Sequence, residues 1–152
     1  MELILWRHAD AEEGSPDRLR ELTALGHKQA GQLADWLNVR LPEHCRILAS
    51  PATRAQQTVD KLERDYDVLE TIGPAADPLA VLKAAAWPDA GQAVLVVGHQ
   101  PTLGRLASLL LLGRQVDLDF ARGAVWWFEQ RDPADAYTLR LKAVMTPEMT
   151  LK

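Results

Sequence analysis

The chain has 152 residues, and its content of 47% hydrophobic and 25% charged residues is typical of a folded protein with a sizeable core. Its net charge of -4 argues against a general nucleic-acid-binding protein, which would need a basic face, although it leaves room for a local cationic pocket. The single cysteine, Cys45, excludes an intrachain disulfide framework and favours a reducing compartment.

The first half of the chain predicts two strand-and-helix units. Thr23 is a good helix N-cap, and Pro42 ends the helix that follows it. A second helix begins near Ser50, with a proline in its first turn. The first helix is expected to bury Leu25, Ala30, Leu33, Ala34 and Leu37. The expected elements are a buried strand over residues 2–7, a polar loop over 9–21, a helix over 24–39, a strand over 45–49 and a helix over 50–64.

The second half of the chain predicts a central strand and an edge hairpin. Residues 93–97 form an unbroken apolar run, as expected for a strand that is buried on both faces of a parallel sheet. Asp132, Pro133 and Asp135 separate the last two strands and predict a hairpin. The expected elements are a weak strand over residues 66–72, a short helix over 79–87, the strand over 93–97, a helix over 101–112 and strands over 124–130 and 137–145.

This alternation of strands and helices predicts an α/β fold. We expect a three-layer α/β/α sandwich with a mostly parallel central sheet and an antiparallel edge, as a single domain over residues 1–152. The longest apolar run, residues 106–112, is far shorter than the roughly 18 residues that cross a membrane. The apolar start of the chain runs directly into Arg7 rather than a cleavage region, so no signal peptide is expected. A cytoplasmic protein without membrane contact follows by default.

Three strand-to-helix junctions carry side chains that suit a phosphoryl group. The first strand ends at Arg7 and His8, the second leads to Arg54, and the strand over 93–97 leads to His99. Parallel strands end at the same edge of a sheet, so these groups can converge there. Arginine binds phosphate oxygens in bidentate fashion, and a position near a helix start adds to anion binding. Histidine is a recognised covalent nucleophile, and the pattern therefore predicts a phosphoryl-transfer site.

Four sequence motifs, taken in order, resemble those of the histidine phosphatase superfamily, whose fold is phosphoglycerate mutase-like. Residues 5–9 read LWRHA and resemble the RHG signature, with Ala9 where glycine is usual. The other matches are LTALG with the following Gln29 and Ala30, against LTxxGxxQA; SPATRAQQT over residues 50–58, against SPxxRAxQT; and GHQP over 98–101, against GHxP. The short length, without a large insertion, is similar to the SixA-type phosphohistidine phosphatase branch.

The resemblance implies a role for each residue of the proposed site. His8 would be the nucleophile that becomes phosphohistidine, and water would then hydrolyse this intermediate. The resemblance implies no metal and no organic cofactor. The substrate would be a protein carrying phosphohistidine or a small phosphorylated metabolite. The phosphate pocket would be formed by Arg7, Arg54 and His99, with Gln100 beside them.

The sequence departs from the family pattern at the general acid. Many members carry a glutamate after the third strand, but residues 71–77 contain none. Asp10 or Asp77 could serve instead, or the site could lack a dedicated acid. A phosphohistidine can leave as neutral imidazole, whose conjugate acid has a pKa of about 6.5. A site without a strong acid is therefore better matched to P–N cleavage than to alkyl P–O cleavage.

Three functions fit these motifs. The first is hydrolysis of protein phosphohistidine through His8. The second is hydrolysis of small phosphomonoesters at the same site, which the short chain disfavours because few insertions leave an open pocket. The third is a non-catalytic module that binds a phosphoprotein, whose mark would be the loss of a pocket residue, whereas all four are present.

Other groups that could carry chemistry favour simpler interpretations. A cysteine-phosphatase loop starting at His44 would require arginine where Pro51 stands, so Cys45 is expected in the core. None of the four histidines shows the close spacing of zinc ligands. Arg18 and Arg20 either help to recruit an acidic or phosphorylated partner or are simply solvated. The aromatic strand with Trp126 and Trp127 is expected to place one face in the core and the other at an edge or interface.

Overall fold

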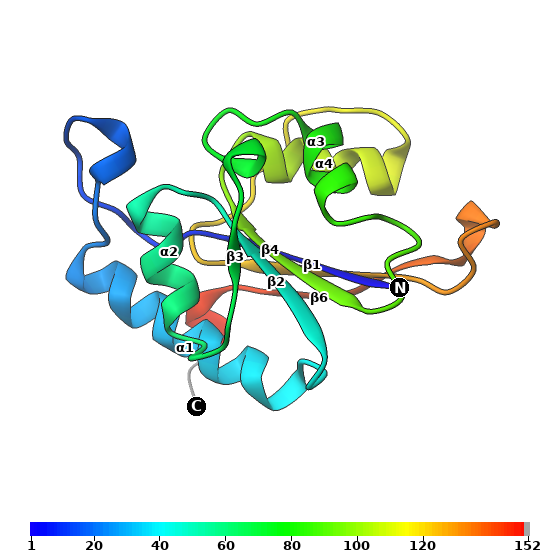
Figure 1. Cartoon of the computed structure of the whole chain (residues 1–152), viewed down its shortest axis with the longest axis horizontal. Coiled ribbons are helices and arrows are strands. Elements are labelled where there is room, and N and C mark those ends of the chain that lie inside the picture. Colours follow the sequence, from blue (N-terminus) through cyan, green and yellow to red (C-terminus); the bar gives the residue numbers. More distant parts are fainter. Residues whose placement is uncertain (151–152) are drawn as a thin grey trace.

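A six-stranded mixed sheet forms the middle layer of the computed structural model, which describes residues 1–150 (Figure 1). Its strand order is β3-β2-β4-β1-β5-β6, and the first four of these strands are parallel. β5 runs antiparallel to β1, and β6 runs antiparallel to β5, so the predicted antiparallel edge is confirmed. The strands are β1 (Glu2–Arg7), β2 (Cys45–Ala49), β3 (Asp67–Val68), β4 (Ala93–Gly98), β5 (Val125–Gln130) and β6 (Leu139–Met145).

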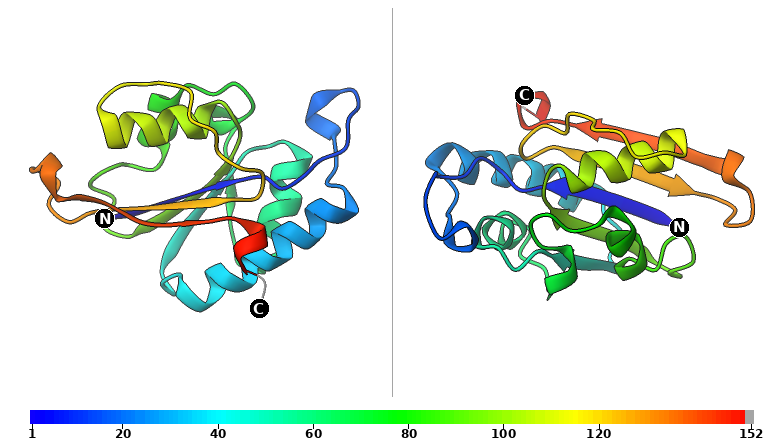
Figure 2. Two further views of the ribbon diagram at one scale, coloured as in Figure 1. Left: turned by 180° about the vertical axis from the view of Figure 1, so that it is seen from behind. Right: turned by 90° about the horizontal axis from the view of Figure 1, so that it is seen from above.

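Helices cover both faces of this sheet, which confirms the predicted three layers (Figure 2). One face is covered by α1 (Ala24–Arg40) and α2 (Thr53–Asp60). The other face is covered by α3 (Pro78–Ala84) and α4 (Thr102–Leu112). Short 3-10 helices occur as η1 (Asp17–Leu19), η2 (Glu70–Ile72), η3 (Ala136–Thr138) and η4 (Pro147–Thr150).

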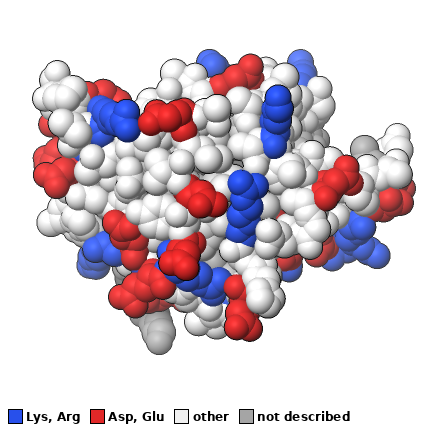
Figure 3. Space-filling view, viewed as in Figure 1, with Lys and Arg blue, Asp and Glu red and all other residues white. Residues whose placement is uncertain are grey.

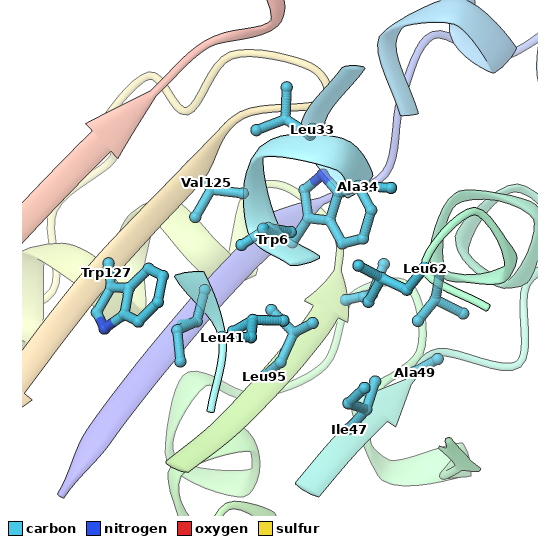
Figure 4. Packing of buried hydrophobic residues seen from close by; sticks show 14 of the residues in the cluster. Trp6, Leu33, Ala34, Leu41, Ile47, Ala49, Leu62, Leu95, Val125 and Trp127 are labelled. Atoms are coloured by element: carbon cyan, nitrogen blue, oxygen red, sulfur yellow. The ribbon is translucent and has the colours of Figure 1, made fainter. Parts of the chain in front are cut away.

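Alternation along β1 supplies both halves of the core. Ile4 and Trp6 point towards α1 and α2, whereas Leu3 and Leu5 point towards α3 and α4. All four are fully buried, which explains why this strand has no polar face. Figure 4 shows the cluster beneath α1, where Trp6 and Trp127 lie among aliphatic side chains from the helices and from β2, β4 and β5.

The two tryptophans of β5 both pack against aromatic rings. Trp127 lies edge-on to Trp36 at 6.2 Å, and Trp126 stacks on Phe120 at 5.3 Å between ring centroids. Trp127 is buried in the core, whereas Trp126 is only partly buried. Cys45 is half-buried against the same core, and burial raises the pKa of its thiol to about 11.

Several predicted boundaries are wrong, each for a local reason. Residues 66–72 form only the two-residue β3, because its exposed edge position gives way to η2. The second helix begins at Thr53 rather than Ser50, since Ser50 Oγ accepts from Ala52 N–H and forms a turn first. Leu25 is 55% exposed, because it lies in the first turn of α1, off the buried stripe.

Charged groups of both signs are interspersed on the face shown in Figure 3. Among residues 1–150, no helix has the length and apolar character that a membrane crossing requires.

Candidate active site

A pocket of about 320 Å³ lies at the carboxyl edge of the parallel strands. The parallel register fixes this convergence, because Arg7 of β1 is level with Gly98 of β4. The predicted residues Arg7, His8, Arg54, His99, Gln100 and Asp10 all line this pocket, whereas Asp77 does not. Ala11, Glu13, Arg20, Pro74 and Arg122 complete the lining.

The His8 ring is fixed in one tautomer. Its Nδ1 lies 2.8 Å from the carbonyl oxygen of Ala9, which can only accept, so Nδ1 carries the proton. The other nitrogen, Nε2, therefore holds a lone pair. Burial lowers the pKa of His8 to about 4, and the nearby charges of Arg54 and Arg7 contribute to this shift. His8 is therefore a neutral imidazole at pH 7, with a nucleophilic nitrogen.

His99 faces His8, with ring centroids 5.1 Å apart, but it is held differently. Its Nε2 lies 2.7 Å from Ser50 Oγ, and its Nδ1 lies 3.5 Å from Arg54 Nη2. Because the guanidinium can only donate, Nδ1 accepts and Nε2 carries the proton. Burial lowers the pKa of His99 to about 3, with further contributions from His8 and Arg54. Both nitrogens of His99 are engaged, whereas Nε2 of His8 has no partner within residues 1–150.

Two arginines present buried N–H groups in this pocket. Arg7 Nη1 donates to the carbonyl oxygen of Phe120 at 2.7 Å, and Arg54 is 4% exposed. The Nε atoms of Arg7 and Arg54 are both buried and have no hydrogen-bond partner in the described part of the chain. Burial and the neighbouring charge of Arg122 lower the pKa of Arg7. Because buried donors without partners are costly, this pair is well suited to the oxygens of an anion.

The backbone beside His8 is locked by its neighbours. Ala9 N–H donates to Thr58 Oγ1 at 3.1 Å, and this hydroxyl donates to the carbonyl oxygen of Arg54 at 2.8 Å. The turn after β1 is therefore tied to the helix that carries Arg54. Among residues 1–150, the non-glycine residues with positive φ are Glu63, Ala75 and Ala86. Ala9 is not one of them, so alanine replaces the usual glycine without backbone strain.

Neither candidate acid is free in this pocket. Asp10 Oδ1 accepts from Arg122 Nη1 at 2.9 Å, and its Oδ2 accepts from Thr23 Oγ1 at 2.7 Å. Asp77 Oδ1 accepts from Leu79 N–H at 2.9 Å and caps α3. Asp10 therefore holds the turn after β1 in place, while Asp77 belongs to a helix cap outside the pocket lining.

The side-chain amide of Gln100 is also hydrogen-bonded at both ends to backbone groups. Its Nε2 donates to the carbonyl oxygen of Leu118 at 2.8 Å, and its Oε1 accepts from Gly104 N–H at 2.6 Å. The Gln100 side chain therefore joins the start of α4 to the segment that leads to Phe120, whose carbonyl holds Arg7.

Three charged lining residues could not be predicted from the sequence as part of the site. Glu13 and Arg20 come from the polar loop over residues 9–21, which has no periodicity that could assign them. Arg122 comes from a turn that Gly123 N–H joins to the carbonyl oxygen of His8 at 3.1 Å. In the sequence, Gly123 next to Arg122 is the only local feature that could have indicated this turn. Arg18 lies outside the pocket lining and pairs with Glu70 at 3.3 Å.

Known proteins resemble this chain in sequence and in architecture. Residues 3–73 match the sequence profile of the histidine phosphatase superfamily (branch 1). The phosphohistidine phosphatase SixA of Escherichia coli is 30% identical over 122 residues, which cover 74% of this chain and 76% of that protein. A SixA homolog of Haemophilus influenzae is 34% identical over 131 residues, which cover 72% of this chain and 77% of that protein. The chain belongs to the histidine phosphatase superfamily.

A solved structure of SixA complexed with tungstate extends this likeness to the whole fold. It superposes with a TM-score of 0.80 and 27% identity, over 97% of each chain. The resemblance inferred from the four motifs is therefore confirmed, as is the prediction that this superfamily member is a phosphatase. Within residues 1–150, no group of three or more His, Cys, Asp or Glu side chains could hold a metal ion.

Proposed function

We propose that this histidine phosphatase hydrolyses phosphohistidine on a protein, by way of a phosphoryl group carried on His8. The observation that carries this proposal is the His8 tautomer, with Nδ1–H held by Ala9 and a neutral Nε2 beside two buried arginines. The relatives named phosphohistidine phosphatase support the substrate class. A cytoplasmic location, which the single half-buried Cys45 favours, stays a prediction.

The first step transfers the phosphoryl group to the protein. The lone pair of His8 Nε2 forms a bond to phosphorus as the P–N bond of the substrate breaks. The other nitrogen of the substrate ring carries a proton taken from solvent, so the ring keeps the electron pair of the broken bond and leaves as a neutral imidazole. Arg7 and Arg54 supply Nε–H donors to the phosphoryl oxygens. His99 lines the same pocket.

The second step releases phosphate. A water oxygen bonds to phosphorus while the bond to His8 Nε2 breaks, and the lone pair returns to that nitrogen. The proton of the water leaves to the phosphate or to solvent. Nδ1–H stays on Ala9 throughout, so His8 needs no change of tautomer between turnovers.

The state of the pocket carboxylates favours a nitrogen leaving group. Asp10 is held by Arg122 and Thr23, and Asp77 caps a helix outside the lining, so neither is placed to protonate an alkoxide. A phosphohistidine needs no acid in the pocket, because the free nitrogen of its ring can take the proton from solvent near neutral pH, as expected for an imidazole with a pKa of about 6.5. This match favours phosphohistidine over small phosphomonoesters, which would be hydrolysed at the same site.

The decisive experiment compares substrates and traps the intermediate. We expect a phosphohistidine protein to be turned over at least about tenfold faster than a phosphoserine peptide or sugar phosphates across a pH series. When the reaction of a substrate with a labelled phosphoryl group is quenched without acid, the label should be found on His8. His8→Ala should abolish both the labelling of the protein and the turnover. His44→Ala, at an exposed histidine, is the matched control.

Three results would contradict the proposal. Full activity in His8→Ala would show that His8 is not the nucleophile and would contradict the whole mechanism. Efficient turnover of alkyl phosphates with poor turnover of phosphohistidine would keep the mechanism but assign the protein to small phosphomonoesters. Binding of phosphoprotein without any turnover would instead indicate a phosphoprotein-binding module.

A further inference from the structure

Asp17, in η1 of the loop over residues 9–21, holds the guanidinium of Arg54 from outside the pocket. Its carbonyl oxygen accepts from Arg54 Nη1 at 2.8 Å, and its carboxylate Oδ2 accepts from Arg54 Nη2 at 3.1 Å. The Arg54 side chain is only 5% exposed, whereas that of Asp17 is 56% exposed. A surface loop thus makes a two-point contact with a buried cation of the candidate active site.

The planar guanidinium has two edges that can each hold an acceptor pair, and Asp17 takes one of them. Its two oxygens bind Nη1 and Nη2, which form the end edge. The side edge consists of Nε–H and the second proton of Nη2. Nε is buried and without a partner in the described chain, and Nη2 lies 3.5 Å from His99 Nδ1. The contact with Asp17 therefore turns the side edge towards the two histidines.

A second arginine braces Asp17 from the other side. Asp17 Oδ1 accepts from Arg20 Nη1 at 3.0 Å, and Arg20 Nε donates to the carbonyl oxygen of Glu12 at 2.7 Å. The hydrogen bond from Arg20 is the main cause that lowers the pKa of Asp17; burial opposes this shift, and the contact with Arg54 adds to it. The Asp17 carboxylate is therefore ionised at neutral pH and fixed between two cations, although it lies at the surface.

We propose that Asp17 is a positioning residue for the phosphoryl group. It holds the end edge of Arg54, while His99 Nδ1 accepts from the second proton of Nη2, so that the Nε–H of the side edge is left to donate to a phosphoryl oxygen. Asp17 itself does not touch the substrate and acts through Arg54. This inference rests on the proposed function for its catalytic consequence, but its consequence for phosphate binding does not depend on turnover.

Charge and position predict effects of opposite sign. If Asp17 acted only as a nearby negative charge, its removal would strengthen the attraction between the pocket and an anion. If Asp17 orients Arg54, its removal loosens the guanidinium and weakens the hydrogen bond from Nε–H to the phosphoryl group, even though the pocket becomes more positive. The direction of the change in phosphate affinity therefore separates the two roles.

The loop also supplies a matched control. Arg18 of η1 pairs with Glu70 at 3.3 Å, so the same loop is tethered to the body by a pair that leaves Arg54 untouched. Glu70→Gln removes the charge from this tether, as Asp17→Asn does from the contact with Arg54, and it leaves the contact between Asp17 and Arg54 unchanged. A role in loop tethering alone would therefore give Glu70→Gln and Asp17→Asn similar effects.

The experiment measures inorganic phosphate binding by calorimetry, with kcat and KM for the phosphohistidine protein in parallel. We expect Asp17→Ala to weaken phosphate binding about tenfold or more and to lower kcat further than it raises KM, because the variant loses the carboxylate contacts to Arg54 Nη2 and Arg20 Nη1 and keeps only the backbone carbonyl on Arg54 Nη1. Asp17→Asn should be intermediate, since its amide oxygen still accepts from Nη2. Glu70→Gln should stay within twofold of the wild type.

Unchanged or tighter phosphate binding in Asp17→Ala would overturn the proposal, and so would an equal loss in Glu70→Gln. If Asp17→Ala does not fold, as judged by circular dichroism, Asp17→Asn decides the same question. A wild-type protein that binds phosphate but never carries a phosphoryl group on His8 would contradict the proposed function, while the binding series would still test Asp17.

Discussion

Each end of the sheet holds a pocket, and the larger of these two pockets lacks the histidines and most of the arginines that phosphoryl transfer would use. The cavity at the amino ends of the parallel strands measures about 590 Å³, against about 320 Å³ at the carboxyl ends. Residues 1–2, 91–93 and 129–131 contribute to the larger cavity, whose lining includes no histidine and a single arginine, Arg131. The smaller one joins two histidines to four arginines.

The state of the polar groups explains this difference better than size does. At the amino end, the terminal ammonium of Met1 donates to the carbonyl oxygen of Gln130 at 2.6 Å, as the strands finish in ordinary pairing. At the carboxyl end, the Nε atoms of Arg7 and Arg54 are buried without partners within residues 1–150. Folded proteins rarely leave buried donors unsatisfied, so such donors mark a site better than empty volume does.

Arg54→Lys tests whether the carboxyl end depends on guanidinium geometry. Lysine keeps the positive charge but cannot bind phosphate oxygens and Asp17 at separate edges. We expect kcat/KM for a phosphohistidine protein to fall by about 10²–10³, the usual cost of removing one preorganised donor. Arg105→Lys, in the exposed pair with Asp117, is the control. A loss below threefold in Arg54→Lys would mean that charge alone suffices at this end.

Gly26→Ala tests how closely the carboxyl end is packed. A Cβ at this position of α1 would overlap the carbonyl oxygen of Asp10, a backbone atom two residues from His8. We expect the displaced turn to lower the free energy of unfolding by about 1–3 kcal/mol and to reduce activity. Gly31→Ala, in the same helix with nothing within 4 Å, should instead stabilise by about 0.5–1 kcal/mol. Urea unfolding of both variants measures the contrast, and equal effects would contradict it.

Acid should weaken the fold through the same pocket. Burial lowers the pKa of His8 from 6.5 to about 4, so the unfolded chain takes up this proton first as the pH falls. The contribution of His8 is therefore complete above about pH 6.5 and is lost as the pH falls towards 4. Between these limits we expect the wild type to lose up to about 3 kcal/mol more than His8→Gln in urea unfolding. Parallel pH curves for the two proteins would rule out a buried neutral His8.

The strands and helices that form the core could be predicted because both faces of β1 and β4 are buried. Their continuous apolar runs have no other good interpretation. The weak strand at the sheet edge could not be placed, since β3 is exposed and pairs with β2 at only two positions. Leu25 misled the assignment of the buried face of α1, because periodicity does not show where a helix first meets the sheet.

The residues that line the candidate active site also fall into a group that could be predicted and a group that could not. Arg7, Arg54 and His99 follow strands whose register brings them together, so the strand-end rule located them. Glu13, Arg20 and Arg122 come from irregular segments, for which no local pattern exists. Arg20 is held inside its own loop by Glu12 and Asp17, and Arg122 reaches the pocket through Asp10. The placement of Asp10 and Asp77 likewise depended on partners, Arg122 for one and a helix N–H for the other.

Arg131→Ala at the amino end should have the smallest effect. This arginine lines the larger cavity, at the opposite end of the sheet from His8, and its side chain is exposed. Exposed substitutions away from special features usually change stability by no more than about 0.5 kcal/mol. We therefore expect kcat/KM within twofold of the wild type, in the same assay that shows the large loss in Arg54→Lys. A loss comparable to that of Arg54→Lys would show that the amino end takes part in function, and unsatisfied buried donors would then no longer distinguish the two pockets.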